Sequence, residues 1–339
     1  MTKGDGDTDG WKRLVLKSLP APAWLSRDAP HGDVVLSSRA RYMRNLAGFR
    51  FPNRAATDEL MTVMKRIVGV AEDSHLGFEA VKGLAKAERD HLVGCRLVSP
   101  DFQWNEPARM LLMDQARSIS IMVNEEDHLR AQALTAGWSI DAAESAAGAT
   151  SKLFEDKLPM AQHPRFGYLS ASPFNCGDGR RLSCMMHLIG LANSRRLPEV
   201  LKALNVRGLT ARGLFGESSR AVGAFLQVSV IGRPRAEFVG AVDYLIREER
   251  TTRNEALDAL LEKAQQAREF IERSRTLSPA EALRLLGWVR WASGRQLPWA
   301  PRQMREVDQF LTMVDIRPDE SGKTRAAERA DALRRMLPP

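Results

Sequence analysis

The chain has little lysine for a basic protein. Only 11 of its 50 basic residues are lysine and 39 are arginine, against 42 acidic residues, for a net charge of +8. Residues 251–339 hold 16 basic and 13 acidic residues and residues 1–250 hold 34 and 29, so no basic tail or arm is present. This even spread disfavours a nucleic-acid binder. Either the arginine reflects a composition bias at the surface, or a minority forms an anion site, because the planar guanidinium matches phosphate and carboxylate oxygens.

Long apolar runs and metal-binding patterns are also missing. No stretch of 18 apolar residues occurs, and residues 1–10 are polar without the apolar core of a signal peptide. The three cysteines cannot all pair, and neither a C-x-x-C pattern nor a histidine-rich spacing accompanies them. With 44% hydrophobic and 27% charged residues the composition is globular. We therefore expect a soluble, cytoplasmic protein without a structural zinc and without a membrane partner.

The apolar pattern predicts two regions that follow a polar tail. Alternation predicts strands, one of them with Ser37, Arg39 and Arg41 on one face, and a spacing of three to four residues predicts helices. The expected fold is α+β, an antiparallel sheet flanked by helices, followed by a smaller all-helical C-terminal domain. The expected domains are a tail at 1–23, a catalytic domain at 24–250 and a helical domain at 251–339. Strands are expected at 33–41, 109–113, 118–123 and 221–231, and helices from Thr57, at 131–158, at 182–188, after Pro234 and from Ser278.

Three segments carry residues suited to phosphate chemistry. Asn124 to Arg130 places three adjacent carboxylates after a strand, and their repulsion calls for a counter-charge, a metal or a cationic substrate. Residues 207–217 set arginine and glutamate among glycines, which permit close backbone approach to an anion. In residues 175–181, Arg180 and Arg181 precede the expected helix at 182–188, whose N-terminus would suit a phosphate. A solvated acidic turn and ordinary glycine turns are the alternative interpretations.

Taken together, these segments resemble the ATP:guanido phosphotransferase family, and within it the bacterial protein-arginine kinases. Five matches occur in the order of the family: Ser37-Ser-Arg-Ala-Arg41, the Asn-Glu-Glu-Asp-His-Leu-Arg string at 124–130, and the segments 166–175, 177–181 and 212–217.

The resemblance implies roles for individual residues. The catalytic candidates are Glu125, Glu126, Asp127 and Glu217, which would orient a guanidinium and take its proton. Arginines would hold the phosphates of ATP, with Mg²⁺ bound through ATP and not directly by the protein. The ATP-binding candidates are Ser37, Ser38, Arg39, Arg41, Arg96, Arg130, Arg181, Leu182, Ser183, Cys184, Met185, Arg212, Gly213, Leu214, Phe215 and Gly216.

The order of the segments favours a protein substrate. Kinases of free guanidino metabolites are expected to carry a helical domain of about a hundred residues before the Ser-Ser-Arg strand, whereas here 36 residues precede Ser37 and a helical region follows the core. The resemblance then implies proteins with exposed arginine as substrates, a Clp-type protease system as a partner, and a homodimer.

Three departures from the family pattern keep alternatives open. Ser172 replaces a reactive cysteine, Asp178 replaces a threonine near the phosphates, and residues 321–326 retain only the final Arg-Ala of a phosphoarginine pocket. The alternatives are a kinase of a free guanidino metabolite and a weakly active or inactive relative that acts as a regulatory binding protein.

Overall fold

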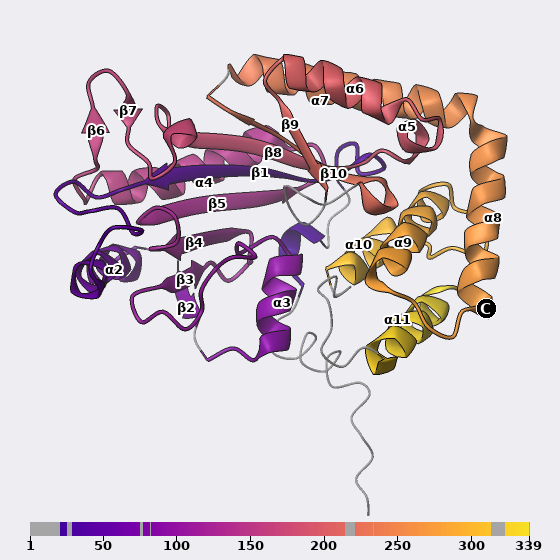
Figure 1. The fold of residues 1–339 in the computed structure, drawn as a ribbon, viewed down its shortest axis with the longest axis horizontal. Coiled ribbons are helices and arrows are strands. Elements are labelled where there is room, and N and C mark those ends of the chain that lie inside the picture. The colour runs from indigo at the N-terminus through magenta and orange to yellow at the C-terminus, as the bar shows by residue number, and fades with distance from the viewer. Residues whose placement is uncertain are drawn as a thin grey trace, which may run out of the picture.

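A computed structural model describes residues 21–25, 29–74, 77–81, 83–213, 221–232, 234–312 and 323–338. Its centre is an eight-stranded sheet in the order β2-β3-β4-β5-β1-β8-β10-β9, in which every neighbouring pair is antiparallel (Figure 1). The strands are β1 (Val35–Arg44), β2 (Glu79–Val81), β3 (Met110–Met113), β4 (Ile119–Val123), β5 (Leu129–Ala136), β8 (Arg180–His187), β9 (Thr210–Gly213) and β10 (Phe225–Ile231), with β6 (Gln162–His163) and β7 (Gly167–Tyr168) in a separate two-stranded sheet.

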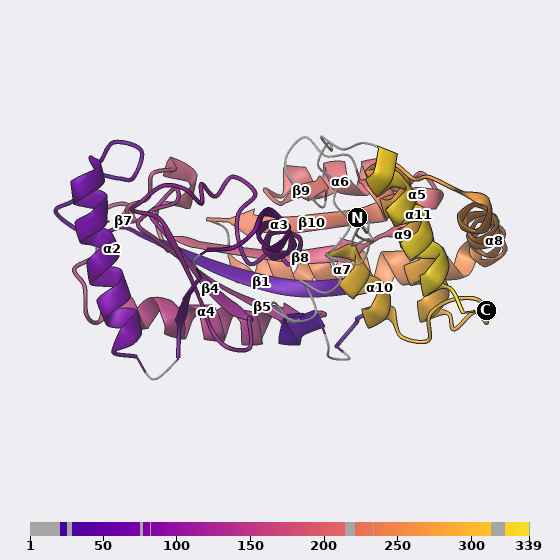
Figure 2. The same cartoon turned by 90° about the horizontal axis from the view of Figure 1, so that it is seen from below.

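Two long helices cover one face of the sheet. Helices α4 (Ile140–Glu155) and α7 (Arg235–Glu255) lie on the same side of it (Figure 2). Their apolar residues join one buried cluster with Leu182, Cys184 and Met186 of β8. Because side chains alternate along a strand, the residues between them point to the other face. The remaining helices around the sheet are α2 (Thr57–Glu72), α3 (Lys86–Gly94), α5 (Ile189–Asn193) and α6 (Leu197–Val206), with three-residue turns η1 (Ala23–Leu25), η2 (Pro173–Asn175) and η3 (Val222–Ala224).

The C-terminal part is helical, as the sequence predicts. Helices α8 (Leu257–Arg273), α9 (Pro279–Gly294), α10 (Met304–Leu311) and α11 (Lys323–Met336) share a buried core. Ser278 caps α9, where its hydroxyl accepts a hydrogen bond from the Glu281 N–H and the Glu281 carboxylate accepts one from the Ser278 N–H. Trp291 and Trp299 are buried in this core and Trp288 packs against it, so these rings serve packing.

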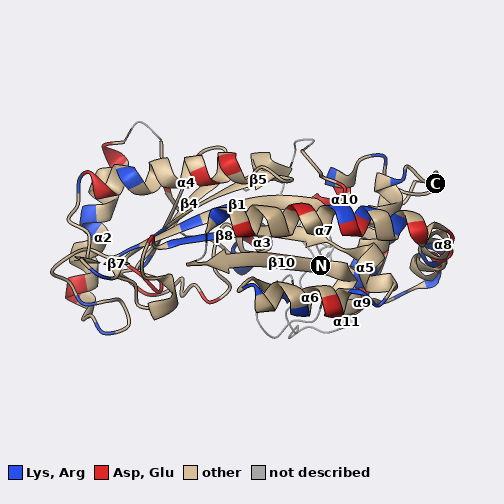
Figure 3. Ribbon diagram, turned by 90° about the horizontal axis from the view of Figure 1, so that it is seen from above, with Lys and Arg blue, Asp and Glu red and all other residues tan. Residues whose placement is uncertain are grey.

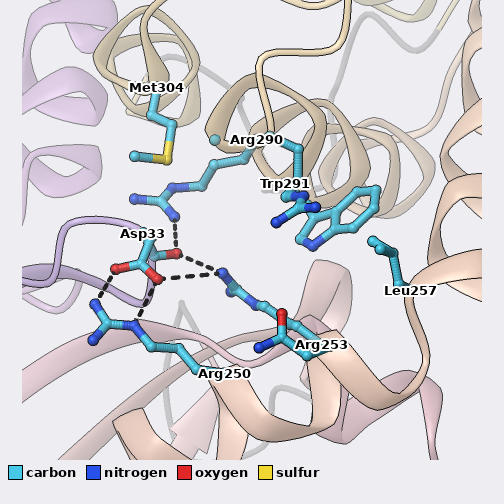
Figure 4. A pocket seen from close by; sticks show the side chains of 10 residues that line it. Asp33, Arg250, Arg253, Leu257, Arg290, Trp291 and Met304 are labelled. Atoms are coloured by element: carbon cyan, nitrogen blue, oxygen red, sulfur yellow. Dashed lines mark hydrogen bonds and ion pairs between the residues drawn. The ribbon is translucent and has the colours of Figure 1, made fainter.

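An arginine network joins the helices to the segment before β1. Arg250 of α7 binds the Asp33 carboxylate at 2.6 and 3.0 Å, and Arg290 of α9 donates to the Asp33 carbonyl (Figure 4). The same arginine donates to the Gly32 carbonyl at 2.7 Å. Arg290 also pairs with Asp308 at 2.6 Å. The domain boundary expected at residue 250 falls inside α7, whose C-terminal turns belong to this network.

Two helix predictions are wrong. Residues 182–188 form most of β8, which pairs with β1 on one side and β10 on the other. Residues 131–136 complete β5, and the helix begins at Ile140. Both segments are short and apolar, so periodicity does not separate strand from helix there, and pairing with neighbouring strands overrides the helix preference of alanine and leucine. The strands expected at 109–113 and 118–123 are confirmed, and they pair with each other as an antiparallel hairpin. Thr57 begins α2, but Ala56 occupies the cap position.

Candidate active site

The face of the sheet opposite α4 and α7 forms the floor of a cavity of about 920 Å³. Register explains which side chains meet there, because Arg41 of β1 lies opposite Gln132 of β5 and Arg181 of β8. Figure 3 shows basic residues on the neighbouring strands β1 and β8. Six arginines from separate parts of the chain line the cavity: Arg39, Arg41, Arg96, Arg130, Arg181 and Arg212.

Arg41 is a buried cation with unused hydrogen-bond donors. Its exposed fraction is 5%, and its Nε and Nη2 have no hydrogen-bond partner. Burial, and then repulsion from Arg39, Arg181 and Arg130, lowers the pKa of Arg41 well below its usual value. An unpaired buried charge is costly, so this arrangement is suited to an anion that supplies the missing acceptors.

The other arginines are oriented by neighbouring polar groups. Arg39 donates to Gln227 Oε1 at 2.6 Å and to Ser183 Oγ at 3.3 Å. Arg181 donates to Ser229 Oγ at 3.0 Å. Arg96 adopts a positive φ of 62°, lies over the Trp24 ring at 4.7 Å, and has its pKa lowered to about 10 by burial. Held guanidinium groups lose little entropy when they bind an oxyanion.

Two carboxylates line the same cavity with different electrostatic surroundings. Burial alone would raise the pKa of Glu125, but the attraction of Arg130, whose Nη1 donates to Glu125 at 2.5 Å, holds this pKa below its usual value. Burial, and then the negative charge of Asp127, raises the pKa of Glu126. One carboxylate is therefore held ionised, and the other is the stronger base.

Comparison with known proteins agrees with this arrangement. The sequence profile of the ATP:guanido phosphotransferase C-terminal catalytic domain matches residues 59–239. The chain is 36% identical to the protein-arginine kinase of Shouchella clausii over 255 residues, 71% of either chain. It is 34% identical to the protein-arginine kinase of Moorella thermoacetica over 317 residues, 87% of this chain and 89% of that one. The chain belongs to the ATP:guanido phosphotransferase family.

Solved structures of guanidino kinases share the fold. A lombricine kinase aligns with a TM-score of 0.56 at 23% identity, over 71% of this chain and 72% of that chain. A duplicated taurocyamine kinase from Schistosoma mansoni aligns with a TM-score of 0.58 at 20% identity, over 68% of this chain and 36% of that chain. As a member of the family the chain is a kinase, with a large antiparallel sheet, flanking helices and further helices at its C-terminal end.

Asp127 lies outside the cavity although Glu125 and Glu126, which precede it in the chain, line it. It is fully buried, and its carboxylate accepts hydrogen bonds from Asn45 Nδ2 at 2.6 Å, from the Ser170 hydroxyl at 2.9 Å and from the Ala171 N–H at 2.8 Å. Its oxygens are thus occupied by Asn45 and by the loop that follows β7. Asp127 positions this loop next to Glu126 and does not face the cavity.

Several residues that were predicted to contact the nucleotide do not line the cavity. The helix expected at 182–188 does not form, so its N-terminus is absent; the backbone of this segment, in β8, is paired with β1 and β10. Ser38 donates to the Gly137 carbonyl at 2.8 Å. Ser37, Ser38, Leu182, Ser183, Cys184 and Met185 are buried and do not line the cavity, whereas Gly213 does. Leu214, Phe215, Gly216 and Glu217 lie outside the described residues.

Two of the residues that depart from the family pattern, Ser172 and Asp178, lie in different surroundings. The Asp178 side chain is 82% exposed and lies 3.6 Å from Arg180, so its carboxylate does not face the arginine cluster. Ser172 lines the cavity. The Cys176 thiol accepts a hydrogen bond from the Ser170 N–H at 3.4 Å, within the loop that carries Ser172. Residues 321 and 322 of the C-terminal pattern lie outside the part of the chain that is described.

His128 has a structural role. Its Nδ1 accepts a hydrogen bond from the Leu46 N–H at 3.1 Å, and its Nε2 lies 2.9 Å from the Arg50 carbonyl. Its ring bridges two backbone groups of the segment after β1.

Sequence reasoning missed polar residues of the cavity floor. Gln132, Thr210 and Gln227 line the cavity together with the exposed Asp101 and Phe174. Gln132 is two residues from Arg130 and Thr210 is two residues from Arg212, so alternation along strands would have placed them on the arginine face. Among the described residues, no group of three or more His, Cys, Asp or Glu could hold a metal, and no helix is long and apolar enough to span a membrane.

Proposed function

We propose that this chain is an ATP-dependent protein-arginine kinase, which transfers the γ-phosphate of ATP to the guanidinium of arginine side chains in proteins. The relatives that cover most of the chain carry the name protein-arginine kinase. The observation that carries the proposal is the cavity itself. It combines a buried arginine with unused donors, Arg41, and the carboxylate pair Glu125 and Glu126.

The arginines would bind the triphosphate and stabilise the charge that develops during transfer. Phosphoryl transfer depends mainly on alignment of the reacting groups and on neutralisation of the phosphate oxygens. Arg41 and Arg39 extend from β1, Arg130 from β5 and Arg181 from β8, so the donors converge from adjacent strands. Mg²⁺ fits this site when it is carried by the phosphates of ATP, since arginines and not a carboxylate cluster form the floor.

The carboxylates would orient the substrate guanidinium and accept its proton. A free guanidinium is protonated at neutral pH and is a poor nucleophile. Glu125, held ionised by Arg130, would hydrogen-bond the guanidinium. Glu126, with its raised pKa, would take the proton as the nitrogen attacks the γ-phosphorus, while the bond from that phosphorus to the bridging oxygen breaks and ADP leaves. Glu217 is proposed as a further carboxylate from the opposite loop, on the basis of the resemblance.

Phosphoarginine formation tests this proposal directly. The chain is incubated with ATP, Mg²⁺ and a bulk protein substrate, and peptides are analysed by mass spectrometry without acidic steps. We expect phosphoarginine with the wild type and none above background with Glu126→Gln. Labelling of free arginine without labelling of protein would instead identify a metabolite kinase. ATP binding by calorimetry without transfer to either acceptor would identify a regulatory binding protein.

Several features remain predictions of the same proposal. A Clp-type protease would receive the modified proteins, the chain would form a homodimer, and it would act in the cytoplasm. Light scattering tests the dimer, and a mass near the 37.8 kDa of one chain would contradict it. Because the protein is itself rich in arginine, we also expect self-phosphorylation, which the same acid-free spectrum of the protein after exposure to ATP would detect.

A further inference from the structure

Phe174 is an exposed aromatic residue at the edge of the cavity. It lies in η2, directly after Pro173, and lines the cavity while 82% of its surface is exposed. Large aromatic side chains are usually buried because exposure to water is unfavourable, so an exposed one beside a binding cavity suggests contact with a partner. Most of the ring is available to a molecule that enters from solvent.

The loop that carries Phe174 is fixed beside the carboxylates. Asp127 accepts hydrogen bonds from Ser170 and Ala171, and within the next turn the Asn175 N–H donates to the Ser172 carbonyl at 2.9 Å. Asp127 follows Glu126 directly in the chain. A fully buried carboxylate therefore ties the loop of Phe174 to the segment that supplies the proposed base.

This position assigns Phe174 to the acceptor end of the cavity. The γ-phosphate must face the carboxylates if the attacking nitrogen is held there, and the adenine is at the opposite end of ATP. A residue fixed beside Glu126 is thus next to the acceptor and away from the base of the nucleotide. Most of the Phe174 ring lies outside the cavity wall. The ring is therefore better placed to contact the residues that flank the acceptor arginine than to contact the guanidinium of that arginine.

We propose that Phe174 determines substrate specificity by packing against an apolar side chain that flanks the acceptor arginine in a polypeptide. This inference rests on the proposed function. The occupant is an extended peptide segment with an arginine that enters the cavity and an aliphatic neighbour that covers the Phe174 ring. The carboxylate of Glu126, exposed on the cavity lining beside this loop, disfavours an acidic segment at the same place.

Matched peptides test the proposal. Two peptides contain one arginine each and differ only in its neighbour, leucine in one and serine in the other. We expect the wild type to phosphorylate the leucine peptide with a kcat/KM about tenfold higher, mainly through KM, as burial of one aliphatic side chain allows. Phe174→Ala should reduce this preference to less than twofold and leave the KM for ATP unchanged.

The exposed Phe166 provides the control. It is 51% exposed and stacks on His163 at 4.8 Å, but it does not line the cavity. Phe166→Ala should therefore retain the tenfold preference. An unchanged preference in Phe174→Ala, or a raised KM for ATP, overturns the inference while the proposed function stands. If the wild type forms no phosphoarginine on any protein or peptide, the proposed function itself fails.

Discussion

At the scale of single residues, the site concentrates interactions that are unfavourable for folding. Arg41 is buried among other guanidinium groups, and two of its nitrogens have no hydrogen-bond partner. A buried cation without a counter-charge costs free energy of folding unless a ligand compensates. This cost in folding free energy is consistent with a binding function, since unfavourable interactions of this kind are retained mainly at active sites.

Replacement of Arg41 by methionine should separate stability from function. Arg41→Met removes the buried charge and keeps a similar volume, so we expect the free energy of unfolding to rise by about 1 kcal/mol or more. ATP binding, measured by calorimetry, should fall at least tenfold. Arg54, which is exposed in the loop between β1 and α2, serves as the control. Arg54→Met should change neither the free energy of unfolding nor ATP binding. A less stable Arg41→Met would contradict the view that this charge is uncompensated.

Glu126→Gln should slow catalysis and leave nucleotide binding intact. The amide keeps the shape but cannot accept the proton, so kcat should fall about 100-fold or more. The raised pKa of Glu126 also predicts that wild-type kcat/KM rises with pH through a value above that of an ordinary glutamate, because only the ionised form acts as base. Stopped assays over a pH series measure both effects. Glu106→Gln, at an exposed position outside the cavity, should behave as wild type.

At the scale of elements, close backbone packing holds the C-terminal helices against the sheet. A Cβ on Gly287 of α9 would lie 2.4 Å from the Gly223 carbonyl oxygen in η3, which directly precedes β10. Such a contact is possible only for glycine. The helix α9 therefore docks at a single depth on the end of β10, a strand whose Gln227 orients Arg39 in the cavity.

Gly287→Ala should destabilise the protein because the added methyl group would force the backbone of α9 or of η3 to move, and both are packed. We expect a loss of about 1–3 kcal/mol in the free energy of unfolding, from urea titration. Gly240 of α7 is a matched helical control, since a Cβ there would meet nothing within 4 Å. Gly240→Ala should stabilise the protein by about 0.5–1 kcal/mol. Equal effects of the two substitutions would show that helix preference, and not docking, controls the change at Gly287.

The elements also show where sequence reasoning was reliable. The alternation from Ser37 to Arg41 predicts a strand with arginines on one face, and β1 has this arrangement. The helix expected at 182–188 is instead strand β8, because pairing on both sides decides the conformation of an apolar segment. The phosphate site expected at a helix N-terminus is therefore absent. In its place, Arg181 of β8 reaches the cavity.

At the scale of the whole molecule, buried histidines make the fold sensitive to acid. His187, at the end of β8, is fully buried with no partner for either ring nitrogen and stacks on Phe225. Burial, and then repulsion from Arg290 and Arg253, lowers its pKa well below 6.5. Burial likewise lowers the pKa of His91 to about 4. Both rings are neutral in the folded protein and protonate readily only when the chain unfolds.

Stability should therefore fall as the pH drops below 6.5. In that range the unfolded chain binds more protons than the folded one, so each such histidine lowers the free energy of unfolding by up to about 1.4 kcal/mol per pH unit. For His91 the loss continues to about pH 4. His187→Leu should make the dependence on pH shallower, as measured by urea titrations at pH 7.5, 6 and 5. A slope identical to the wild type would show that His187 does not carry this effect.

The sequence by itself determined the family, the antiparallel sheet with C-terminal helices, and the segments that supply arginines and carboxylates. These follow from local patterns, namely alternation along strands and the order of short motifs. Only the tertiary structure decided that Asp127 anchors a loop while Glu126 faces the cavity, that Asp178 turns away from it, and that Phe174 stands at its edge. Adjacent residues in one motif point in different directions, and which of them meets solvent, backbone or an arginine depends on strands that are distant in sequence.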